Sequence, residues 1–456
     1  MTVASRANKT RTNFGVGIVA SLGAFVATIL LGGSELSAVS TAIFFYTLVW
    51  YVDALGKEIA IVPAVALIAS SQWLLGPAIY YTFEGVSHYK YDMYVPEGRY
   101  FSYVLPATIA LIFGLWKFSP IISTNHLRGY FKHQIRLKTK TAQVVFFFGL
   151  AFGVFESYVP TSFRFLFFIG SQTVFISVLY FFVLKSRWRW LALAAVFGMQ
   201  LATSAERGLF HDLLLWSALT LSFVFSELRS RFFVKLIVIL IGALLIAQLQ
   251  LAKSHYRTEI RLNPEQAGIT TLVNSVLEQS VFSSTQQSDT ENNWSELNAR
   301  LNQGWIISAV MNHVPSKQDF EHGETITLAV RDALVPRFLV AKRSVRVSDY
   351  FRKYTGLQVN RNTSFGISVL GEAWVNFGYF GIIFMLLFGA FYGLVFRAIL
   401  RLQKFFPSIV LWTPLVFFQA IKAETEFVVV LNHIIKTGVF IILFYILVRQ
   451  WLRIKI

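Results

Sequence analysis

Apolar residues fill long blocks along most of the chain, and short polar links separate these blocks. Twelve blocks stand out, near residues 14–31, 36–52, 59–80, 100–118, 141–158, 163–184, 190–203, 209–226, 234–252, 378–396, 408–421 and 430–448. A helix needs roughly 20 apolar residues to cross a hydrocarbon core of about 30 Å. The blocks approach that length without period-2 alternation, and a segment in lipid must satisfy its own backbone polar groups. The pattern predicts an all-α, polytopic membrane protein with about twelve transmembrane helices.

Basic residues follow this division of the chain. Arg6, Lys9 and Arg11 precede the first block, which lacks a small-residue cleavage site after it, so we expect a retained first helix. With both termini in the cytoplasm, most Lys and Arg residues fall on cytoplasmic links, and the short outer links hold only Lys90, Arg99, Arg164 and Arg207. The net charge of +17 then reflects membrane topology, so we expect no nucleic-acid partner.

One link differs in kind, because residues 253–363 are polar and far longer than an ordinary loop. We therefore expect three parts: transmembrane helices 1–9 (residues 1–252), an outer loop domain (253–363), and a last part (364–456) with a re-entrant or interfacial segment and helices 10–12. This loop is basic, although it lies on the outer side. A cationic outer domain favours an anionic ligand at the outer leaflet, and attraction to anionic lipid headgroups is the alternative explanation.

The loop also shows helical periodicity. The stretch "WSELNARLNQGWIISAV" predicts an amphipathic helix with one face formed by Trp294, Leu297, Leu301, Trp305 and Ser308. The stretch "TITLAVRDALVPR" predicts a second helix that ends before Pro336. Only "SSTQQSDTENN", residues 283–293, has the composition of a flexible segment. The loop is therefore expected to be mostly helical.

The apolar run at residues 364–396 is too long for one transmembrane helix. Its 33 residues would form a helix of about 50 Å. We expect two elements, with a break near Gly371-Glu372 or at Gly378. Irregular backbone at membrane depth requires surrounding protein or a water-filled cavity, so Glu372 is expected to line a cavity. The alternatives are that Glu372 caps the following helix or pairs with a nearby arginine.

Four ionisable residues interrupt the apolar stretch "LATSAERGLFHDLLLW", residues 201–216. We expect Arg207 at the outer interface, at the start of a helix, where its rigid five-donor guanidinium would bind an anion. The alternative is that Arg207 snorkels at the membrane edge and only sets topology. Glu206 is the expected neutralising partner of Arg207, and His211 and Asp212 are expected to pair with each other.

Missing motifs narrow the class of chemistry. The sequence contains no Walker loop, no Asp-x-Asp pair in a soluble αβ domain, no His-Glu-x-x-His motif and no cysteine. This argues against ATP-driven transport, sugar-nucleotide chemistry, a metal centre and a thiol nucleophile. We therefore expect neither a metal nor another cofactor.

Several stretches together resemble the oligosaccharide repeat-unit polymerases, the Wzy-type O-antigen and exopolysaccharide polymerases of bacteria. They are "TSAERGLF" between two helices, the single large outer loop, "RLNQGWIISAV" followed by "VP", then "GET", "ALVPRFLVAKR" and "SVLGEAWVNFGYFGI". The similarity covers roughly residues 195–400. It implies a multi-pass protein of the bacterial inner membrane, with a periplasmic loop domain and with lipids, a chain-length regulator and a flippase as partners.

The resemblance also implies a reaction and its residues. A glycan on undecaprenyl diphosphate would be transferred to the terminal sugar of a new lipid-linked repeat unit. Arg207 and Arg300 would be catalytic, Arg337 and Lys342 would bind substrate, and Glu372 would serve as general base. Arginines can stabilise the developing charge of the diphosphate without a metal, each charge-assisted hydrogen bond contributing about 1.5–3 kcal/mol. His313 and His433 are alternative bases.

Two other functions stay open from sequence. An O-antigen ligase would use the same donor and a lipid A core acceptor, but the loop histidine motif usual in ligases is not evident. A transporter or flippase of a lipid-linked anion would be expected to show inverted repeats and paired broken helices, which the single asymmetric loop disfavours.

Overall fold

A computed structural model describes residues 14–83, 91–135, 138–207, 210–228, 230–262, 268–278, 297–299, 301–335, 347–359 and 365–450. These residues form helices joined by turns, with one isolated β-bridge between Glu58 and Ser123 and no β-strand among them. The first half contains α1 (Phe14–Leu30), α2 (Glu35–Ala54), α3 (Ile61–Ser70), the π-helix η3 (Ser71–Leu75), α4 (Gly76–Thr82), α5 (Glu97–Phe118), α6 (Thr124–Gly129), the π-helix η4 (Tyr130–Ile135), α7 (Thr139–Phe155), α8 (Thr161–Ser171), α9 (Thr173–Val183), α10 (Arg189–Arg207) and α11 (His211–Leu228).

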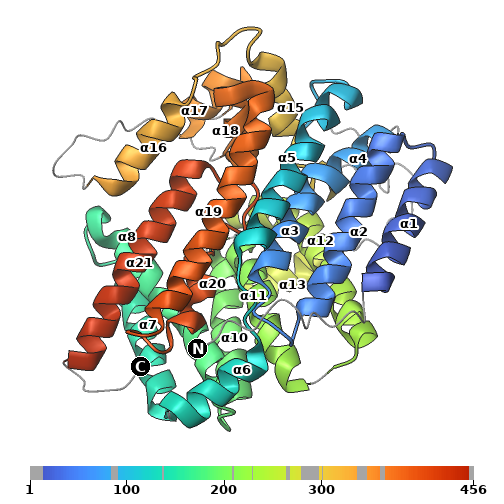
Figure 1. The fold of residues 1–456 in the computed structure, drawn as a ribbon. Coiled ribbons are helices and arrows are strands. Elements are labelled where there is room, and N and C mark those ends of the chain that lie inside the picture. Colours follow the sequence, from blue (N-terminus) through green and yellow to red (C-terminus); the bar gives the residue numbers. More distant parts are fainter. Residues whose placement is uncertain are drawn as a thin grey trace.

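The second half continues with helices of very different length. They are α12 (Phe232–Leu262), α13 (Ile269–Glu278), α15 (Gly304–His313), α16 (Glu324–Leu334), α17 (Val347–Thr355), α18 (Ser368–Phe377), the 3-10 helix η6 (Gly378–Phe380), α19 (Gly381–Leu402), the 3-10 helix η7 (Ile409–Trp412), α20 (Thr413–Val416) and α21 (Phe427–Gln450). The all-α prediction is confirmed for the described part of the chain. Figure 1 shows the long helices side by side, with α15 to α18 gathered at one end, here named the outer layer.

Within the described residues, seven helical segments are long and apolar enough to span a membrane. They are Glu35–Ala54, Ile61–Thr82, Glu97–Phe118, Phe163–Val183, Phe232–Ala252, Ser368–Leu402 and Phe427–Arg449. The shorter apolar helices α1 and α7 coincide with two further predicted blocks. The topology of twelve membrane crossings stays a prediction.

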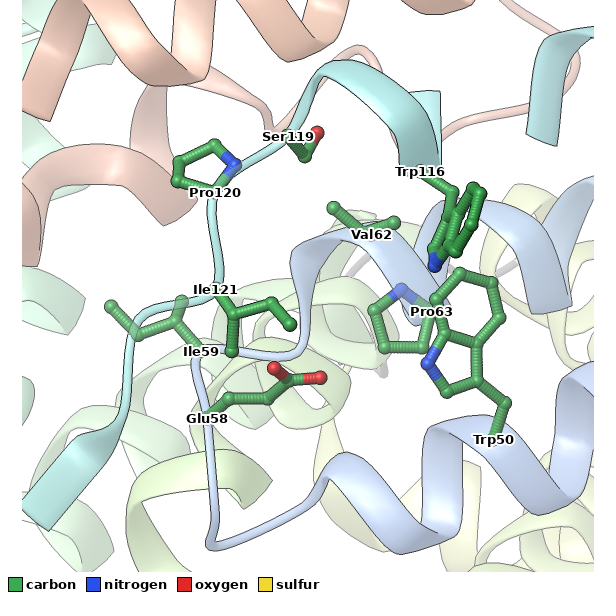
Figure 2. Close-up of a pocket in the computed structure, with 9 residues that line it drawn as sticks. All are labelled: Trp50, Glu58, Ile59, Val62, Pro63, Trp116, Ser119, Pro120 and Ile121. Carbon is green, nitrogen blue, oxygen red and sulfur yellow. The ribbon is translucent and has the colours of Figure 1, made fainter. Parts of the chain in front are cut away.

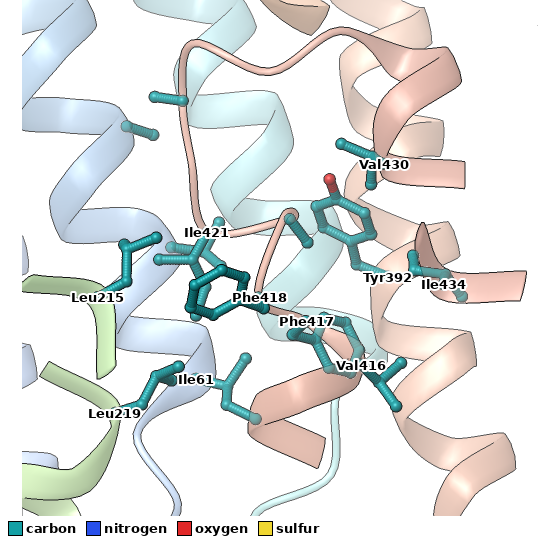
Figure 3. Packing of buried hydrophobic residues seen from close by; sticks show 14 of the residues in the cluster. Ile61, Leu215, Leu219, Tyr392, Val416, Phe417, Phe418, Ile421, Val430 and Ile434 are labelled. Atoms are coloured by element: carbon teal, nitrogen blue, oxygen red, sulfur yellow. The ribbon is translucent and has the colours of Figure 1, made fainter. Parts of the chain in front are cut away.

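The predicted eleventh helix, residues 408–421, is not one helix. Only η7 and the four-residue α20 are helical there, and most of residues 408–421 are buried. The chain returns through the protein interior as irregular backbone between α19 and α21, and Figure 3 shows Phe417, Phe418 and Ile421 from it packed against α3, α11, α19 and α21. Surrounding helices shield this backbone, which is the condition for non-helical structure at membrane depth.

The predicted break in residues 364–396 is confirmed at the second of the two expected positions. Helix α18 ends at Phe377, and Gly378 follows with φ +54° and ψ −131°. This left-handed φ is unfavourable for residues with a Cβ atom. Helix α19 then begins at Gly381 and runs beside α5.

Glycines allow α5 and α19 to pack backbone against backbone. A Cβ atom on Gly389 would lie 2.2 Å from the carbonyl oxygen of Leu111, and one on Gly114 would lie 2.3 Å from that of Leu386. A Cβ atom on Gly381 would meet the Tyr103 hydroxyl and one on Gly393 would meet Phe118, so the two helices run in the same direction. The outer layer lies at one end of this pair of helices, which is the upper end in Figure 1.

The expected amphipathic helix around Trp305 is interrupted. Residues 297–299 and Leu301 are helical, but the chain turns at Asn302 and Gln303 before α15 begins at Gly304. The second loop helix is confirmed, because α16 ends at Leu334, before Pro336. The stretch 283–293 lies outside the described residues.

Basic residues meet at the end of the bundle opposite the outer layer. The guanidinium of Arg128 lies 2.8 Å from a carboxylate oxygen of Glu227, and that of Arg189 lies 3.4 Å from its other oxygen. Lys235 donates to the carbonyl oxygen of Leu55 at the same end. These three basic residues are among those predicted to be cytoplasmic.

Candidate functional site

Glu372 lies on α18 at the base of the outer layer and is 2% exposed. Its Oε2 atom accepts a hydrogen bond of 2.9 Å from the backbone N–H of Phe427, the first residue of α21. Its Oε1 atom accepts one of 3.2 Å from the hydroxyl of Tyr350 on α17. Of the sequence alternatives, helix capping describes this position, although the capped helix is α21 and not the next one along the chain.

The N-terminus of α21 suits a carboxylate for two reasons. The first N–H groups of a helix have no partner within the helix, and the aligned peptide dipoles place partial positive charge there. Both effects stabilise the ionised form of Glu372 and oppose the larger cost of burying its charge. Their geometry also fixes the direction of the carboxylate, because its two oxygens bind partners on two different helices.

A second buried carboxyl group, Glu426, lies next to Glu372 at the start of α21. Its Oε1 atom accepts a hydrogen bond of 3.3 Å from the backbone N–H of Ile367, and the side chain is 8% exposed. Burial raises the pKa of Glu426 to about 8, and the negative charge of Glu372 contributes in the same direction. Glu426 therefore binds a proton at pH values where an exposed glutamate is ionised.

Two tyrosines on α17 each donate a hydrogen bond to a carboxylate. Tyr350 binds Glu372, and one turn later the hydroxyl of Tyr354 donates to Glu321 Oε1 at 3.0 Å. Lys353 donates to the same oxygen at 2.7 Å. Burial, followed by the charge of Glu372, raises the pKa of Tyr350 well above its usual range, so its hydroxyl stays protonated. The two similar pairs differ in that Lys353 neutralises only Glu321.

The ionisable residues at the start of α11 pair with the irregular segment before α21. Asp212 Oδ1 accepts a hydrogen bond of 3.1 Å from Lys422 Nζ, and His211 Nδ1 lies 3.9 Å from Glu424 Oε1. The expected pairing of His211 with Asp212 was wrong, because each residue pairs with a group about 210 positions away. These contacts attach the start of α11 to the segment that leads into α21.

Arg207 lies at the end of a helix and not at the start of one. Helix α10 includes Arg207 as its last residue, and α11 begins at His211. A cation at a helix C-terminus is favoured by the helix dipole. Arg207 stands four positions before His211, whose Nδ1 atom lies 3.9 Å from Glu424 Oε1. The side chains of Glu206 and Arg207, like Arg300, Arg337 and Lys342, lie outside the described residues.

The two histidines considered as bases have structural surroundings. His433 is 1% exposed, and its Nε2 atom lies 2.8 Å from the carbonyl oxygen of Leu415. His313 ends α15, and its ring packs against Gly356. Burial, and then the charge of Lys317, lowers the pKa of His313. Glu372 has the better position of the candidate bases, because it contacts both the outer layer and α21.

Several buried polar atoms without a hydrogen-bond partner surround the turn at Asn302. They are Gln72 Oε1, Trp73 Nε1, Asn298 Oδ1 and Asn302 Oδ1. The groups belong to one neighbourhood, because Gln303 N donates to the carbonyl oxygen of Gln72 at 3.1 Å and a Cβ atom on Gly76 would meet Asn302 Cα at 2.6 Å. Buried polar atoms are normally hydrogen-bonded, so these atoms have capacity for water or a polar ligand.

Sequence analysis missed this amide and indole cluster. Its signal is weak, because Asn and Gln in a polar loop are common and a π-helix has no sequence signature of its own. The cluster adjoins the π-helix η3, an element that often occurs at functional sites. Arg300, a predicted catalytic residue, stands between Asn298 and Asn302 in the sequence.

No group of three His, Asp or Glu side chains suited to a metal ion occurs within the described residues. The polar groups near Glu372 and on α17 are carboxylates, tyrosines and a lysine, and those around the turn at Asn302 are amides and an indole. The structure thus defines an all-helical protein with several helices compatible with a membrane and a buried carboxylate beneath an outer helical layer.

Comparison with protein families places the chain more closely. The family described as "Domain of unknown function (DUF8712)" matches residues 88–455. The chain belongs to this family. The match begins just before α5 and includes the outer layer, the irregular segment and α21. Comparison with curated proteins and with solved structures finds no match.

Proposed function

We propose that this protein is a polymerase of lipid-linked oligosaccharides in the inner membrane of a bacterium, with both termini in the cytoplasm and the outer layer in the periplasm. The observation that carries the proposal is the position of Glu372. This carboxylate lies at the base of the outer layer, directed by the N-terminus of α21 and by Tyr350. The sequence resemblance matches Glu372 to a Gly-Glu motif of the polymerases, and the geometry supports the role of a general base.

The proposed reaction transfers a glycan from undecaprenyl diphosphate to a sugar hydroxyl. The acceptor oxygen forms a bond to the anomeric carbon of the donor, while the bond from that carbon to the diphosphate breaks. Because Glu372 itself is buried, the acceptor proton passes to Tyr350 while the Tyr350 proton passes to Glu372. The half-buried tyrosine is thereby unchanged at the end of the step, and the proton resides on Glu372.

Arginines complete the proposed site. The charge that develops on the diphosphate needs fixed cationic donors, and guanidinium groups bind its oxygens in pairs. Arg207 is the last residue of α10, and Arg300 stands between Asn298 and Asn302 in the sequence. Arg337 and Lys342 belong to the link between α16 and α17 and are proposed to bind the lipid diphosphate.

The amide and indole cluster supports a carbohydrate substrate. Sugar hydroxyls donate and accept hydrogen bonds, and amide oxygens and an indole N–H match both requirements. Trp73, Asn298 and Asn302 are each at least nine-tenths buried and hold unpartnered polar atoms. A sugar bound there would satisfy them, whereas an apolar ligand would leave them unpaired.

One observation favours a second function, the transport of a lipid-linked anion. Irregular backbone between α19 and α21, with a helix N-terminus at Phe427, resembles the broken helices that form transporter sites. A ligase is the other alternative, with the same donor and a lipid A core acceptor. The polymerase is preferred because the carboxylate and tyrosine pair provides a path for a proton, which transport of the lipid does not need.

Purified protein supplied with undecaprenyl-diphosphate oligosaccharide tests the proposal. We expect longer glycans from the wild type and at least a hundredfold slower extension by Glu372→Gln, because one positioned base contributes about 10²–10⁴-fold. Glu321→Gln is the matched control, since Glu321 also binds a tyrosine of α17. Movement of the lipid across liposomes without longer glycans would instead identify a transporter.

Arg207→Lys separates recognition from topology. Lysine keeps the charge and loses the paired donors of the guanidinium. In a deletion strain, we expect Arg207→Lys to restore a full-length membrane protein and no glycan ladder. A normal ladder would return Arg207 to the role of a snorkelling residue, and a normal ladder in the deletion strain itself would contradict the polymerase proposal.

A further inference from the structure

The pocket between the α2–α3 link and the α5–α6 link is too small for the proposed substrate. Figure 2 shows the Glu58 carboxylate and the indole rings of Trp50 and Trp116 among its lining residues. Its cavity of about 30 Å³ has room for about two water-sized groups, since one needs roughly 10–15 Å³ on this measure. A sugar ring does not fit there, so a further residue for the proposed reaction has to lie elsewhere.

Thr325 belongs to the hydrogen-bonded group around Glu372 in the outer layer. It is the second residue of α16, and its side chain forms hydrogen bonds with Glu372 and with Tyr350. The Glu372 carboxylate also accepts the 3.2 Å hydrogen bond from the Tyr350 hydroxyl. The three side chains come from α16, α17 and α18, so the packing of the outer layer brings them together.

Asn376 fixes the direction of the Thr325 hydroxyl. Its Nδ2 atom donates to Thr325 Oγ1 at 2.6 Å and to the carbonyl oxygen of Glu372 at 2.8 Å. Its Oδ1 atom accepts a hydrogen bond of 3.1 Å from Gly323 N, in the turn before α16, and the side chain is fully buried. Because an amide nitrogen only donates, Thr325 Oγ1 is the acceptor in its bond with Asn376. The hydrogen of the Thr325 hydroxyl is therefore left for Tyr350 or Glu372.

This donor matters when the proton of Tyr350 moves to Glu372. In the proposed step, negative charge develops on the Tyr350 oxygen as its own proton leaves and the acceptor proton arrives. Burial, followed by the charge of Glu372, raises the pKa of Tyr350, and the hydrogen bond with Thr325 acts in the opposite direction. A fixed donor directed at developing charge lowers the barrier without rearrangement of the site.

We propose that Thr325 is a positioning residue for this reaction, with its hydroxyl held by Asn376 and donating to Tyr350 while Tyr350 passes its proton to Glu372. Thr325 neither gains nor loses a proton. The acceptor proton ends on Tyr350 and the Tyr350 proton ends on Glu372, while the acceptor oxygen bonds to the anomeric carbon and the diphosphate leaves. This role rests on the proposed function, because it belongs to that reaction.

Thr325→Val tests the role in the purified full-length protein supplied with undecaprenyl-diphosphate oligosaccharide. Valine keeps the branched shape of threonine and removes the hydroxyl. We expect kcat to fall about tenfold with little change in KM, which is the loss of one hydrogen bond to a developing charge. Thr325→Ser keeps the donor and should restore kcat to within about threefold of the wild type.

Thr327→Val is the matched control, two positions further along α16. Its hydroxyl donates to the carbonyl oxygen of Gly323 at 2.9 Å, so its removal should leave kcat unchanged. A double variant distinguishes positioning from packing. Because Thr325 acts through the Tyr350 hydroxyl, Thr325→Val should cause no further loss of kcat in a Tyr350→Phe protein. Losses that multiply in the double variant would assign Thr325 to the packing of α16 and overturn the inference.

Fluorine NMR separates this inference from the proposed function, because it needs no substrate. With 3-fluorotyrosine in place of Tyr350, we expect the fluorine resonance to shift in Thr325→Val and to stay in place in Thr327→Val. An unshifted resonance or an unchanged kcat in Thr325→Val would overturn the role of Thr325 and leave the proposed function standing. A wild type that extends no glycan would overturn the proposed function and this role with it. Should Thr325→Val not fold, Thr325→Ala removes the same hydroxyl and serves in both measurements.

Discussion

The carboxylate of Glu372 accepts a 2.9 Å hydrogen bond from the backbone N–H of Phe427, 55 positions further along the chain. This bond joins α18, a helix of the outer layer, to the first turn of α21. The same carboxylate binds Tyr350. Glu372 thus connects three helices, and a change there is expected to affect both the reaction and the orientation of the outer layer.

Removal of the Tyr350 hydroxyl should slow the proposed reaction without unfolding the protein. Tyr350→Phe deletes the proton path to Glu372 and keeps the ring that packs 4.8 Å from Tyr354. We expect kcat to fall at least tenfold with little change in KM, because the missing group acts in the transition state. Tyr354→Phe is the control, since its hydroxyl serves Glu321. Equal losses in both variants would assign Tyr350 a structural role.

The buried Glu426 should make stability depend on pH. Its pKa of about 8 exceeds the value of about 4.3 for an exposed glutamate. Between these values the folded state binds more protons than the unfolded state, so the free energy of unfolding falls as pH rises and this loss is complete above pH 8. Thermal unfolding at pH 5, 7 and 8.5 measures the trend. Glu426→Gln should flatten it, and a variant with the wild-type slope would show that another group is responsible.

The unpartnered amide oxygen of Asn302 should matter for substrate binding and not for folding. Asn302→Leu removes a buried oxygen that has no partner, so we expect a melting temperature within a few degrees of the wild type. We also expect KM for the lipid-linked oligosaccharide to rise about tenfold, the equivalent of one hydrogen bond to a sugar hydroxyl. Asn312→Leu, an exposed change on α15, is the control. An unchanged KM in Asn302→Leu would argue against a sugar at this turn.

The contact between α5 and α19 should tolerate no side chain at Gly389. A Cβ atom there would lie 2.2 Å from the carbonyl oxygen of Leu111, so Gly389→Ala must push two backbones apart. We expect a loss of about 1–3 kcal/mol in the free energy of unfolding. Gly438→Ala is the matched control on α21, since nothing lies within 4 Å of that position. Denaturant titration in mixed micelles compares the two, and equal stability would mean that the helices can move apart at no cost.

The pattern of apolar residues in the sequence predicted most of the long helices but did not predict where they begin and end. The apolar blocks correspond to α1, α2, α5 and most later helices, because burial in lipid or protein favours long apolar segments. The segment 408–421 has the same composition and is irregular. Composition indicates only that this segment is buried away from water. Whether its backbone polar groups find hydrogen bonds within a helix or with the surrounding protein depends on the neighbouring helices.

The sequence likewise predicted part of the candidate site and missed the rest. Glu372 stood out in the sequence as an ionisable residue in an apolar run, and its long-range partners Tyr350 and Phe427 did not. The pairing of Asp212 with Lys422 was equally hidden, because 210 positions separate the two residues. Side-chain pairing across such distances is set by the packing of helices, which local pattern does not encode.

The sequence by itself determined that the protein is helical, rich in membrane-length apolar segments, and divided by one large basic loop, because these properties follow from residue order and hydrophobicity. Only the tertiary structure decided that Glu372 caps α21, that Asn302 lies beside the π-helix, and that Glu58 shares a pocket with Trp116. Each of these relationships joins residues far apart in the chain, and these residues come together because the helices pack against one another in the core.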